Sequence, residues 1–274
     1  MGKQVSSLTT IITAAIVAAM VSAVGTSLFL KQKGGAPLAS GTSGGDKGQI
    51  EKIVHDYLLA NPQVLIEMST KLQAQGLQQQ ITALSKELEA KITANSDKLY
   101  RSERAHVAGN PNGDVTIVEF TDYNCGYCRR SMVDVLKLIE SDKNVRVVLK
   151  EAPIFGREPS EEAARVALAT RKQNKYMEFH VAMFTAPGPA DKAKALRVAK
   201  ELGLDMEQLE KDIESDEVKA ALDENIELTK ELGIEGTPFF LVGDRVLPGG
   251  PDNLQDVLKD MVAEVRKNGC SATC

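Results

Sequence analysis

Short dense runs of apolar residues predict the strands of this chain. Residues 115–120 read Val-Thr-Ile-Val-Glu-Phe, a run too short and too apolar for anything but a buried strand. A second run of this kind covers residues 145–149, and a third covers residues 238–242. Gly243-Asp244 follows the third run and is typical of a hairpin turn, so we expect a fourth strand directly after it.

Apolar residues with helical spacing fill most of the remaining chain. One amphipathic segment follows the first strand, and another runs from Leu254 to Val265. A long helical block occupies about residues 154–235, between the second and third strands. This order predicts an α/β domain over residues 108–268 with a helical insertion, and a turn-rich stretch at residues 108–113 marks its start.

A helical arm is expected before this domain, over residues 49–107. Asn61-Pro62 ends one helix of the arm and starts the next. In the second helix four apolar residues are separated by alternate steps of four and three, the pattern of a coiled-coil seam: Leu77, Ile81, Leu84 and Leu88. The seam favours self-association of the arm as a dimer or trimer. Packing of the arm against its own domain is the alternative.

The N-terminal residues 8–30 contain no charged side chain and follow Lys3. A segment of this kind is either a secretory signal peptide or a membrane anchor, so we assign residues 1–30 to one of the two. The uncharged length that ends at Lys31 slightly favours the anchor. Residues 31–48 are rich in glycine and serine and predict a flexible linker. Both interpretations place the rest of the chain outside the cytoplasm, where disulfide chemistry is expected.

Composition and charge narrow the class of protein. The 274 residues are 43% hydrophobic and 26% charged, which is ordinary for a globular protein. A net charge of −5 without a dense basic run argues against a nucleic-acid partner. The chain has four cysteines and no other sign of a disulfide scaffold, which fits a redox enzyme better than a small disulfide-stapled protein.

Two of these cysteines lie where the first strand runs into a helix, in the motif Cys125-Gly126-Tyr127-Cys128. Unpaired backbone N–H groups and the helix dipole stabilise a thiolate at a helix N-terminus. The second cysteine lies about one turn further on, close enough to form a disulfide with the first. We therefore interpret the motif as a thiol–disulfide redox centre.

A metal site is the alternative for these cysteines. The other pair, Cys270 and Cys274, has a different spacing and lies in a polar tail, residues 269–274. The chain has three histidines, none near Cys125 in the sequence: His55, His106 and His180. Zinc usually needs four ligands, so redox chemistry is favoured over copper or zinc binding, and no cofactor is expected. If oxidised, the tail pair would close a small surface disulfide.

The motifs together resemble the thioredoxin superfamily. That resemblance rests on the strand, the CxxC motif and the helix, with Gly236-Thr237-Pro238 before a distant hairpin. The helical insertion is similar to that of the DsbA-like branch. Phe120-Thr121-Asp122 followed by Cys-Gly-Tyr-Cys is similar to the active site of DsbC-type isomerases. A helical arm before such a domain resembles the suppressor-of-copper-sensitivity protein C and Com1-like groups. The resemblance covers about residues 48–268 and implies a thioredoxin fold.

The resemblance also implies roles for individual residues. Cys125 would be the nucleophile and Cys128 the resolving cysteine. Pro238 would be a cis-proline whose preceding backbone faces the cysteines and pairs with a substrate peptide. Thr237 would tune the thiolate and the release of substrate. Glycine and tyrosine between the cysteines replace the proline and histidine of strongly oxidising DsbA proteins, so a less oxidising pair is implied.

Glu119, six residues before Cys125, matches the position of a buried carboxylate that assists proton transfer at the second cysteine in the family. Lys150 would be its partner on the neighbouring strand. A solvated strand position is the alternative for Glu119.

These features predict a periplasmic thiol–disulfide oxidoreductase. The resemblance favours an isomerase or reductase that acts on mispaired secreted proteins through Cys125 and Cys128, and a DsbA-type dithiol oxidase is the alternative. A copper- or zinc-binding envelope protein is a third hypothesis. Its partners would be unfolded secreted proteins, other copies of the chain, and a membrane redox protein that resets the cysteine pair.

Overall fold

The computed structural model describes residues 45–155 and 158–270, which fall into two units that divide between Glu67 and Met68. The expected signal peptide or anchor, residues 1–30, lies outside the described residues, as does the linker up to residue 44. None of the helices in the described ranges is long and apolar enough to cross a membrane.

The first unit consists of helix α2 (Gly45–Ala60) and the start of helix α3 (Gln63–Ala94). The two helices are separated at Asn61-Pro62, as predicted. Seven of its large apolar side chains are more than half exposed: Ile50, Ile53, Val54, Tyr57, Leu59, Leu65 and Ile66. Helices of this length are rarely stable in water without a surface that covers their apolar side chains.

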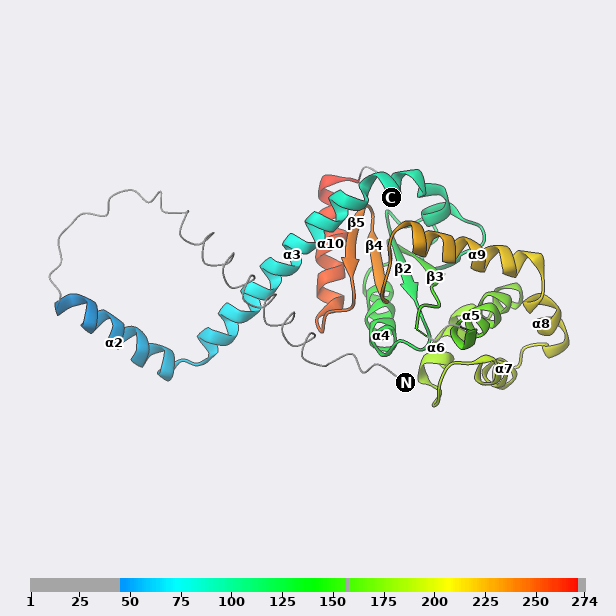
Figure 1. Cartoon of the computed structure of the whole chain (residues 1–274), viewed down its shortest axis with the longest axis horizontal. Coiled ribbons are helices and arrows are strands. Elements are labelled where there is room, and N and C mark those ends of the chain that lie inside the picture. The colour runs from blue at the N-terminus through cyan, green and yellow to red at the C-terminus, as the bar shows by residue number, and fades with distance from the viewer. Residues whose placement is uncertain (1–44, 156–157, 271–274) are drawn as a thin grey trace, which may run out of the picture. The chain divides into compact units, whose positions relative to one another are not determined.

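The second unit is built on a five-stranded sheet in the order β1-β3-β2-β4-β5 (Figure 1). The strands are β1 (His106–Gly109), β2 (Val115–Thr121), β3 (Val145–Glu151), β4 (Phe239–Val242) and β5 (Arg245–Pro248). β2 and β3 are parallel, and the other pairs are antiparallel. The three predicted core strands and the hairpin are confirmed. β1 was not predicted, because only one of its four residues is buried.

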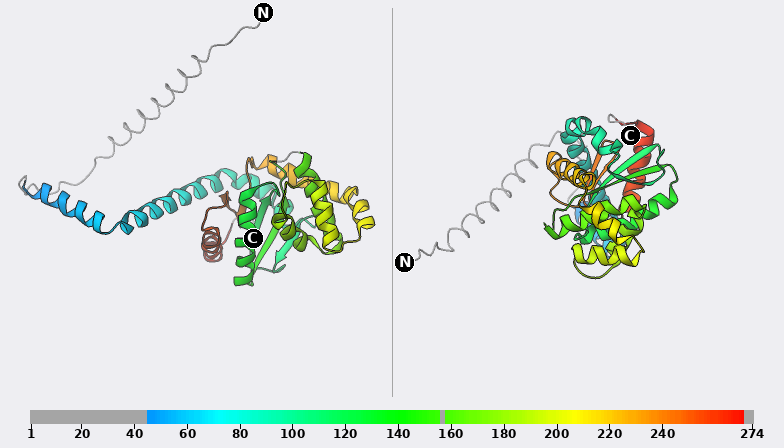
Figure 2. Two further views of the ribbon diagram at one scale, coloured as in Figure 1. Left: turned by 90° about the horizontal axis from the view of Figure 1, so that it is seen from below. Right: turned by 90° about the vertical axis from the view of Figure 1, so that its right-hand side faces the viewer.

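Helices cover both faces of this sheet (Figures 1 and 2). α4 (Gly126–Ser141) and α10 (Leu254–Asn268) pack on one face. The helical turn η1 (Asp97–Arg101) and α9 (Asp216–Glu231) pack on the other. Because side chains alternate along a strand, each strand contributes to two separate cores. On β2, for example, Ile117 belongs to the first core and Val118 to the second.

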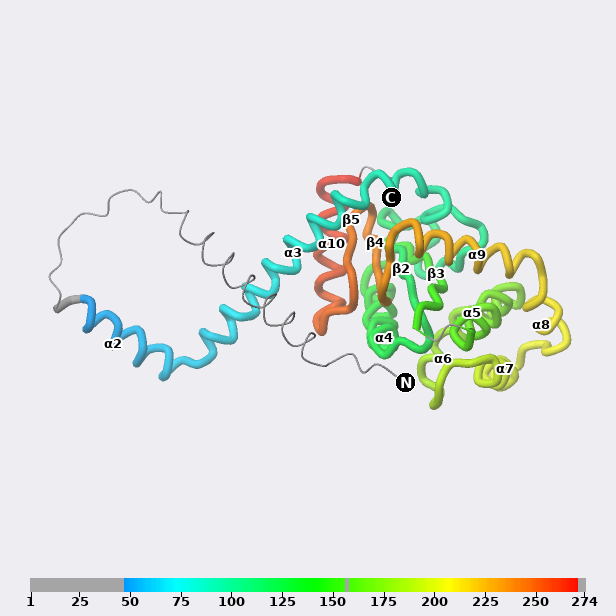
Figure 3. The backbone as a smooth tube through the Cα atoms, in the orientation of Figure 1, coloured from blue at the N-terminus to red at the C-terminus, as the bar shows by residue number. Residues whose placement is uncertain are grey.

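The helical insertion runs from α5 to α9 and is the DsbA-like feature of the fold (Figure 3). Its other elements are α5 (Glu158–Thr170), η2 (Arg171–Gln173), α6 (Tyr176–Thr185), α7 (Lys192–Glu201) and α8 (Met206–Ile213). α5 is central and packs against α6, α7, α8 and α9. Alanines with no exposed surface, such as Ala163 and Ala167, permit this close packing.

The predicted coiled-coil seam lies in this second unit and packs against its own chain, while self-association of the arm stays a prediction. Ile81 and Leu88 are only 5% and 3% exposed, and Leu77 and Leu84 pack partly buried against the same cores. The α3 helix also covers the edge strand β5, where Ser85 Oγ accepts a 2.7 Å hydrogen bond from the backbone N–H of Val246. The apolar stripe is therefore covered within its own chain, the alternative considered above.

Candidate active site

Cys125 is the N-cap residue of α4. Its sulfur accepts a hydrogen bond from the backbone N–H of Cys128, with a distance of 3.4 Å between Cys128 N and Cys125 Sγ. A side-chain cap at this position is stabilised by the unpaired N–H groups of the first turn. Both cysteines are free thiols and are buried, with Cys125 6% exposed and Cys128 fully covered. The predicted strand–CxxC–helix arrangement is therefore present.

Thr237 and Pro238 lie beside this pair, although they are more than a hundred residues away in the chain. The Thr237–Pro238 peptide bond is cis, as the sequence predicted. Cys125 Sγ lies 3.0 Å from the backbone oxygen of Thr237, to which the protonated thiol donates a hydrogen bond. The Thr237 hydroxyl is also buried and makes no hydrogen bond to another group within the described part of the chain. It is therefore available to the thiolate form of Cys125, whose pKa Thr237 lowers.

The two thiols differ strongly in acidity. Hydrogen bonds from the Cys128 thiol and from Thr237 and nearby backbone lower the pKa of Cys125 to about 6, against the effect of burial. Burial raises the pKa of the Cys128 thiol above its ordinary range, and its hydrogen bond with Cys125 raises it further. At neutral pH, Cys125 is therefore mainly thiolate and Cys128 thiol. Because the thiolate is the attacking form, this difference makes Cys125 the nucleophile of the pair.

Asp122 fixes the loop that carries Cys125. Its two carboxylate oxygens accept hydrogen bonds from the backbone N–H groups of Asn124 and Phe155 and from the Ser160 hydroxyl, each at 2.8 Å. Its backbone oxygen accepts from the N–H of Cys125 at 3.0 Å. From the sequence, Asp122 is recognisable only as part of the motif Phe120-Thr121-Asp122. Its role in joining three segments depends on tertiary contacts that the sequence pattern does not reveal.

Glu119 is buried on β2, which excludes the alternative of a solvated position. It is 1% exposed, and the Ser131 hydroxyl of α4 donates a 3.1 Å hydrogen bond to its Oε1. The Ser131 hydroxyl oxygen also lies 3.0 Å from the backbone oxygen of Cys128, an alternative acceptor for its single proton, so Glu119 is connected to the turn of helix that carries the second cysteine. Burial raises the pKa of Glu119 to about 8, while the Ser131 hydrogen bond acts in the opposite direction.

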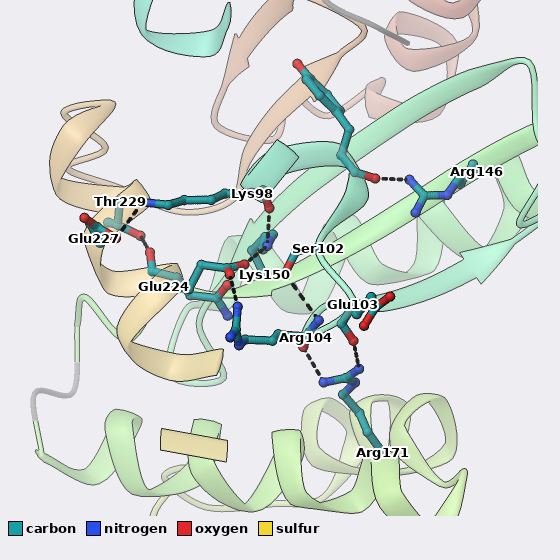
Figure 4. A network of polar contacts seen from close by, with 12 residues as sticks. Lys98, Ser102, Glu103, Arg104, Arg146, Lys150, Arg171, Glu224, Glu227 and Thr229 are labelled. Carbon is teal, nitrogen blue, oxygen red and sulfur yellow. Dashed lines mark hydrogen bonds and ion pairs between the residues drawn. The ribbon is translucent and has the colours of Figure 1, made fainter. Parts of the chain in front are cut away.

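Lys150 is not the partner of Glu119. Lys150 pairs with Phe120 across β2 and β3, and its side chain points into the opposite core from that of Glu119. Its ammonium forms a 2.9 Å ion pair with Glu224 of α9 and donates to the backbone oxygen of Lys98 at 2.7 Å (Figure 4). The expectation failed because a one-residue offset between parallel strands reverses the direction of a side chain.

A mainly apolar cleft of about 470 Å³ lies next to the redox pair. Tyr127 and Phe155 line it, and both rings are more than half exposed. The remaining lining comes from α3, from the loop before Pro238 and from the end of β5, and includes Leu84, Leu88, Ile234, Gly236, Thr237 and Pro248. Exposed aromatic side chains beside a reactive thiolate form an apolar contact surface for a partner of the thiolate.

The metal-site alternative finds no structural support in the described ranges. No group of three or more histidine, cysteine, aspartate or glutamate side chains is arranged there to hold a metal ion. Cys270 is disulfide-bonded and is therefore not available as a thiolate ligand. Cys274 lies outside the described residues.

Comparison with known proteins agrees with this geometry. Residues 116–261 match the family of DSBA-like thioredoxin domains, which is more than half of the chain. The chain belongs to this family. Residues 46–79 match the N-terminal domain of the copper resistance protein ScsC. The recognition of a DsbA-like thioredoxin fold with an ScsC-like helical arm is therefore confirmed.

Solved structures share the fold. A thioredoxin-like oxidoreductase from Silicibacter pomeroyi DSS-3 is 48% identical, with a TM-score of 0.60 over 63% of this chain and 98% of its own. A variant of Proteus mirabilis ScsC is 27% identical, with a TM-score of 0.58 over 84% of this chain and 100% of its own. Among curated proteins, Na(+)/H(+) antiporter NhaA 3 of Salinispora tropica is 27% identical over 56% of this chain. The chain spans about a quarter (24%) of that relative's length.

Proposed function

We propose that this protein catalyses thiol–disulfide exchange on secreted polypeptides, and that it works as an isomerase or reductase in the periplasm or cell envelope. The observation that carries the proposal is the opposite shift of the two thiol pKa values beside the Thr237 carbonyl. A thiolate held at about pKa 6 attacks a disulfide at neutral pH, while a protonated second thiol leaves the mixed disulfide time to rearrange.

In the proposed reaction the Cys125 thiolate attacks one sulfur of a substrate disulfide. A mixed disulfide forms, and the electron pair leaves with the substrate's other sulfur. In isomerisation a substrate thiolate then displaces Cys125, so that a new substrate disulfide forms and the enzyme is unchanged. In reduction Cys128 displaces the substrate, and the enzyme keeps the disulfide. A membrane redox protein that resets the pair is needed only in the second case.

The cleft beside the cysteines supports a polypeptide substrate. Its lining of Tyr127, Phe155, Ile234 and Thr237 places apolar surface next to Cys125 Sγ. Unfolded chains expose apolar side chains near their cysteines, whereas small thiols such as glutathione do not. We therefore expect Phe155→Ser to weaken exchange with an unfolded protein that carries scrambled disulfides and to leave exchange with oxidised glutathione unchanged. Equal effects on both substrates would contradict this role of the cleft.

The deciding experiment compares refolding of scrambled ribonuclease by the wild type and by Cys128→Ala. An isomerase retains activity without its resolving cysteine because the substrate's own thiol completes the reaction. A dithiol oxidase or a dithiol reductase loses its activity, because each of these reactions needs Cys128. Cys125→Ala is the matched control and should be inactive in either case. A fully inactive Cys128→Ala variant would exclude the isomerase and leave a dithiol reductase or the DsbA-type oxidase.

Self-association through the first unit is also proposed. The basis is the set of exposed apolar residues between Ile50 and Leu72, rather than the seam expected from the sequence. Association would cover these side chains and place several redox pairs around one substrate, while hindering a membrane oxidase. In the second unit, Met68 and Leu72 are also exposed, at 55% and 65%.

Sedimentation tests this association directly. The fragment 45–274 should run as an oligomer at tens of micromolar, and a double variant Ile53→Lys with Leu65→Lys should run as a monomer. The monomer should keep its Cys125 alkylation rate and lose ribonuclease isomerisation. A wild-type fragment that sediments as a monomer would remove the proposed role of the arm, without affecting the redox pair.

A further inference from the structure

A second buried polar cluster lies behind the redox loop. Glu151 ends β3 at the position paired with Thr121 of β2, so it faces the same core as Glu119. Two tyrosine hydroxyls donate to its Oε1, Tyr123 at 3.0 Å and Tyr176 at 2.6 Å. All of these polar side chains are at most 4% exposed. The thiol exchange proposed above makes no use of this cluster.

His180 of α6 extends the cluster. Its Nδ1 lies 3.0 Å from the Tyr123 hydroxyl oxygen. Tyr123 has one hydroxyl proton and donates it to Glu151, so its oxygen accepts from an Nδ1–H of His180. Burial lowers the pKa of His180 to about 3, so the ring is neutral and carries one proton. Nε2 is therefore the acceptor nitrogen of the ring.

A small cavity separates this ring from the redox centre. Its volume is about 10 Å³, and Glu119 and His180 line it together with apolar side chains such as Met132 and Leu149. A cavity of about this size accommodates one water molecule when polar groups are present to bind it. Glu119 and His180 are the two polar residues in the lining of this cavity. One water bound between them would connect the carboxyl group with the imidazole.

The charges around the two carboxyl groups are consistent with a shared proton. Within the described residues, neither Glu119 nor Glu151 has an ion-pair partner. Burial raises the pKa of Glu151 to about 8, close to that of Glu119, and the charges of Asp122 and Glu119 raise it further. Near pH 8, where each carboxyl group is about half ionised, the pair therefore holds about one proton, and two acceptors of matched affinity exchange it with little free-energy difference.

Groups further out modulate this pair without neutralising it. His106 of β1 stacks on Tyr176 with 4.4 Å between ring centres, and burial lowers the pKa of His106 to about 4. The Arg171 guanidinium acts on both His106 and Tyr176. Burial and Glu151 raise the pKa of Tyr176 well above its ordinary value, so it stays a donor.

We propose that Glu119 and Glu151 share one proton through His180 and Tyr123, so that Glu151 is a second proton acceptor for the resolving step at Cys128. This inference rests on the proposed thiol–disulfide exchange and adds positioning residues to it. Glu119 must be ionised before it can accept the Cys128 proton. Transfer of its own proton to Glu151 prepares it without requiring contact with solvent.

The step balances in protons and electrons. The Cys128 thiol gives its proton to the Glu119 carboxylate and its sulfur bonds to Cys125, while the bond between Cys125 and the substrate sulfur breaks. The electron pair leaves with the substrate thiolate. The proton then moves from Glu119 through water to Nε2 of His180, the Nδ1 proton passes to Tyr123, and the Tyr123 proton passes to Glu151.

Two tyrosine variants form the matched test. Tyr123→Phe and Tyr176→Phe each remove one hydrogen bond to the same Glu151 oxygen, but only Tyr123 lies between His180 and Glu151. The measurement is the single-turnover rate at which Cys128 resolves a preformed mixed disulfide between Cys125 and a peptide thiol, at pH 6 to 9. Tyr123→Phe should slow resolution about tenfold at pH 8, where the pair holds one proton, and Tyr176→Phe should change it less than about twofold.

A double-mutant test distinguishes proton transfer through Tyr123 from a merely structural role of this residue. In a Glu119→Gln background, Tyr123→Phe should have no further effect on the resolution rate, because the two residues act in one chain. Equal slowing by the two tyrosine variants, or multiplication of the Glu119→Gln and Tyr123→Phe effects, would overturn the proposal. Wild-type protein that forms no mixed disulfide at all would instead refute the proposed function. Alkylation of Cys125 should be unchanged in all three variants.

Discussion

The two faces of the central sheet bury ionisable groups in opposite ways. Lys150 and Glu151 are neighbours on β3 and point to opposite faces. On one face the Lys150 ammonium forms an ion pair with Glu224 at 2.9 Å. Glu224 forms a second ion pair with Arg104 at 3.2 Å (Figure 4). On the other face, within the described residues, the carboxyl groups of Glu151 and Glu119 accept side-chain hydrogen bonds from hydroxyl groups alone.

On one face the buried ionisable groups stabilise the fold, and on the other face they can take part in proton transfer. Although burial acts to raise it, hydrogen bonds and Lys150 hold the pKa of Glu224 below its ordinary value. That pair therefore stays ionised and joins α9 to the sheet. Glu119 and Glu151, with pKa values of about 8, change protonation near neutral pH. A buried group without a counter-charge is poised for proton transfer, and both of these lie on the face of the cysteines.

Removing Lys150 should give the largest effect on stability. Lys150→Met leaves the Glu224 carboxylate buried with only Arg104 as its partner, which should cost about 3–5 kcal/mol in free energy of unfolding. Urea denaturation measures this loss. The pKa of Cys125 should be unchanged, since Lys150 is on the far face of the sheet. A large shift in that pKa would contradict the separation of the two faces.

Glu119→Gln should stabilise the protein at neutral pH. Native Glu119 keeps its proton up to about pH 8, whereas an unfolded glutamate loses it near 4.5, so the native state binds more protons between these values. Wild-type stability therefore falls as pH rises through this window, by up to roughly 1.4 kcal/mol per pH unit from this group. After allowance for an altered hydrogen bond with Ser131, the gain at pH 7 should be about 2 kcal/mol.

The check is a series of urea denaturation curves from pH 4 to pH 8. The difference between Glu119→Gln and wild type should grow with pH and should vanish below pH 4.5. Resolution of the mixed disulfide by Cys128 should be slower in the variant although its fold is more stable. A constant stability difference across the series would mean that Glu119 is ionised in the native protein.

Lys98→Met should have the smallest effect. Lys98 forms a 2.8 Å ion pair with Glu227, but the two side chains are 41% and 53% exposed. Exposed pairs contribute roughly 0–1 kcal/mol, so the change in unfolding free energy should be about 0.5 kcal/mol and should disappear in high salt. Because the backbone oxygen of Lys98 remains, its hydrogen bond with Lys150 is kept. A loss comparable to that in Lys150→Met would remove the contrast between buried and exposed pairs.

The central parts of the fold and site were predictable from local sequence. β2, Cys125 and the start of α4 are contiguous, so a short motif defines them. The cis-proline at Pro238 was implied by the resemblance to the thioredoxin superfamily, through Gly236-Thr237-Pro238 before the hairpin. The family match confirms the DsbA-like thioredoxin fold that these features indicated.

The remaining parts depend on which neighbours each side chain meets in the folded chain, and residue identity alone does not give this. Lys150 was assigned to Glu119 because both are on adjacent core strands, but strand pairing directs them to opposite faces. The apolar stripe on α3 has the same pattern whether its partner is another chain or its own β5. Tyr176 and His180 carry no local signal, since only the packing of α6 against the redox loop brings them to Glu151. In each case the pattern specified an apolar or polar position without specifying its neighbour.

The carboxylate of Asp122 also bears on the order in which the chain becomes active. It accepts hydrogen bonds from the backbone N–H of Phe155 and the hydroxyl of Ser160. The side chain of neighbouring Asn124 donates to the backbone oxygen of Ala190 and accepts from its backbone N–H. During synthesis, Cys125 therefore emerges well before the segments that hold its loop, and Thr237 emerges later still. Contacts at such sequence separation form late in folding. Until the helical insertion and the loop before Pro238 have folded, the nascent chain therefore lacks the contacts that hold the Cys125 loop and the part of the Cys125 pKa shift that Thr237 supplies.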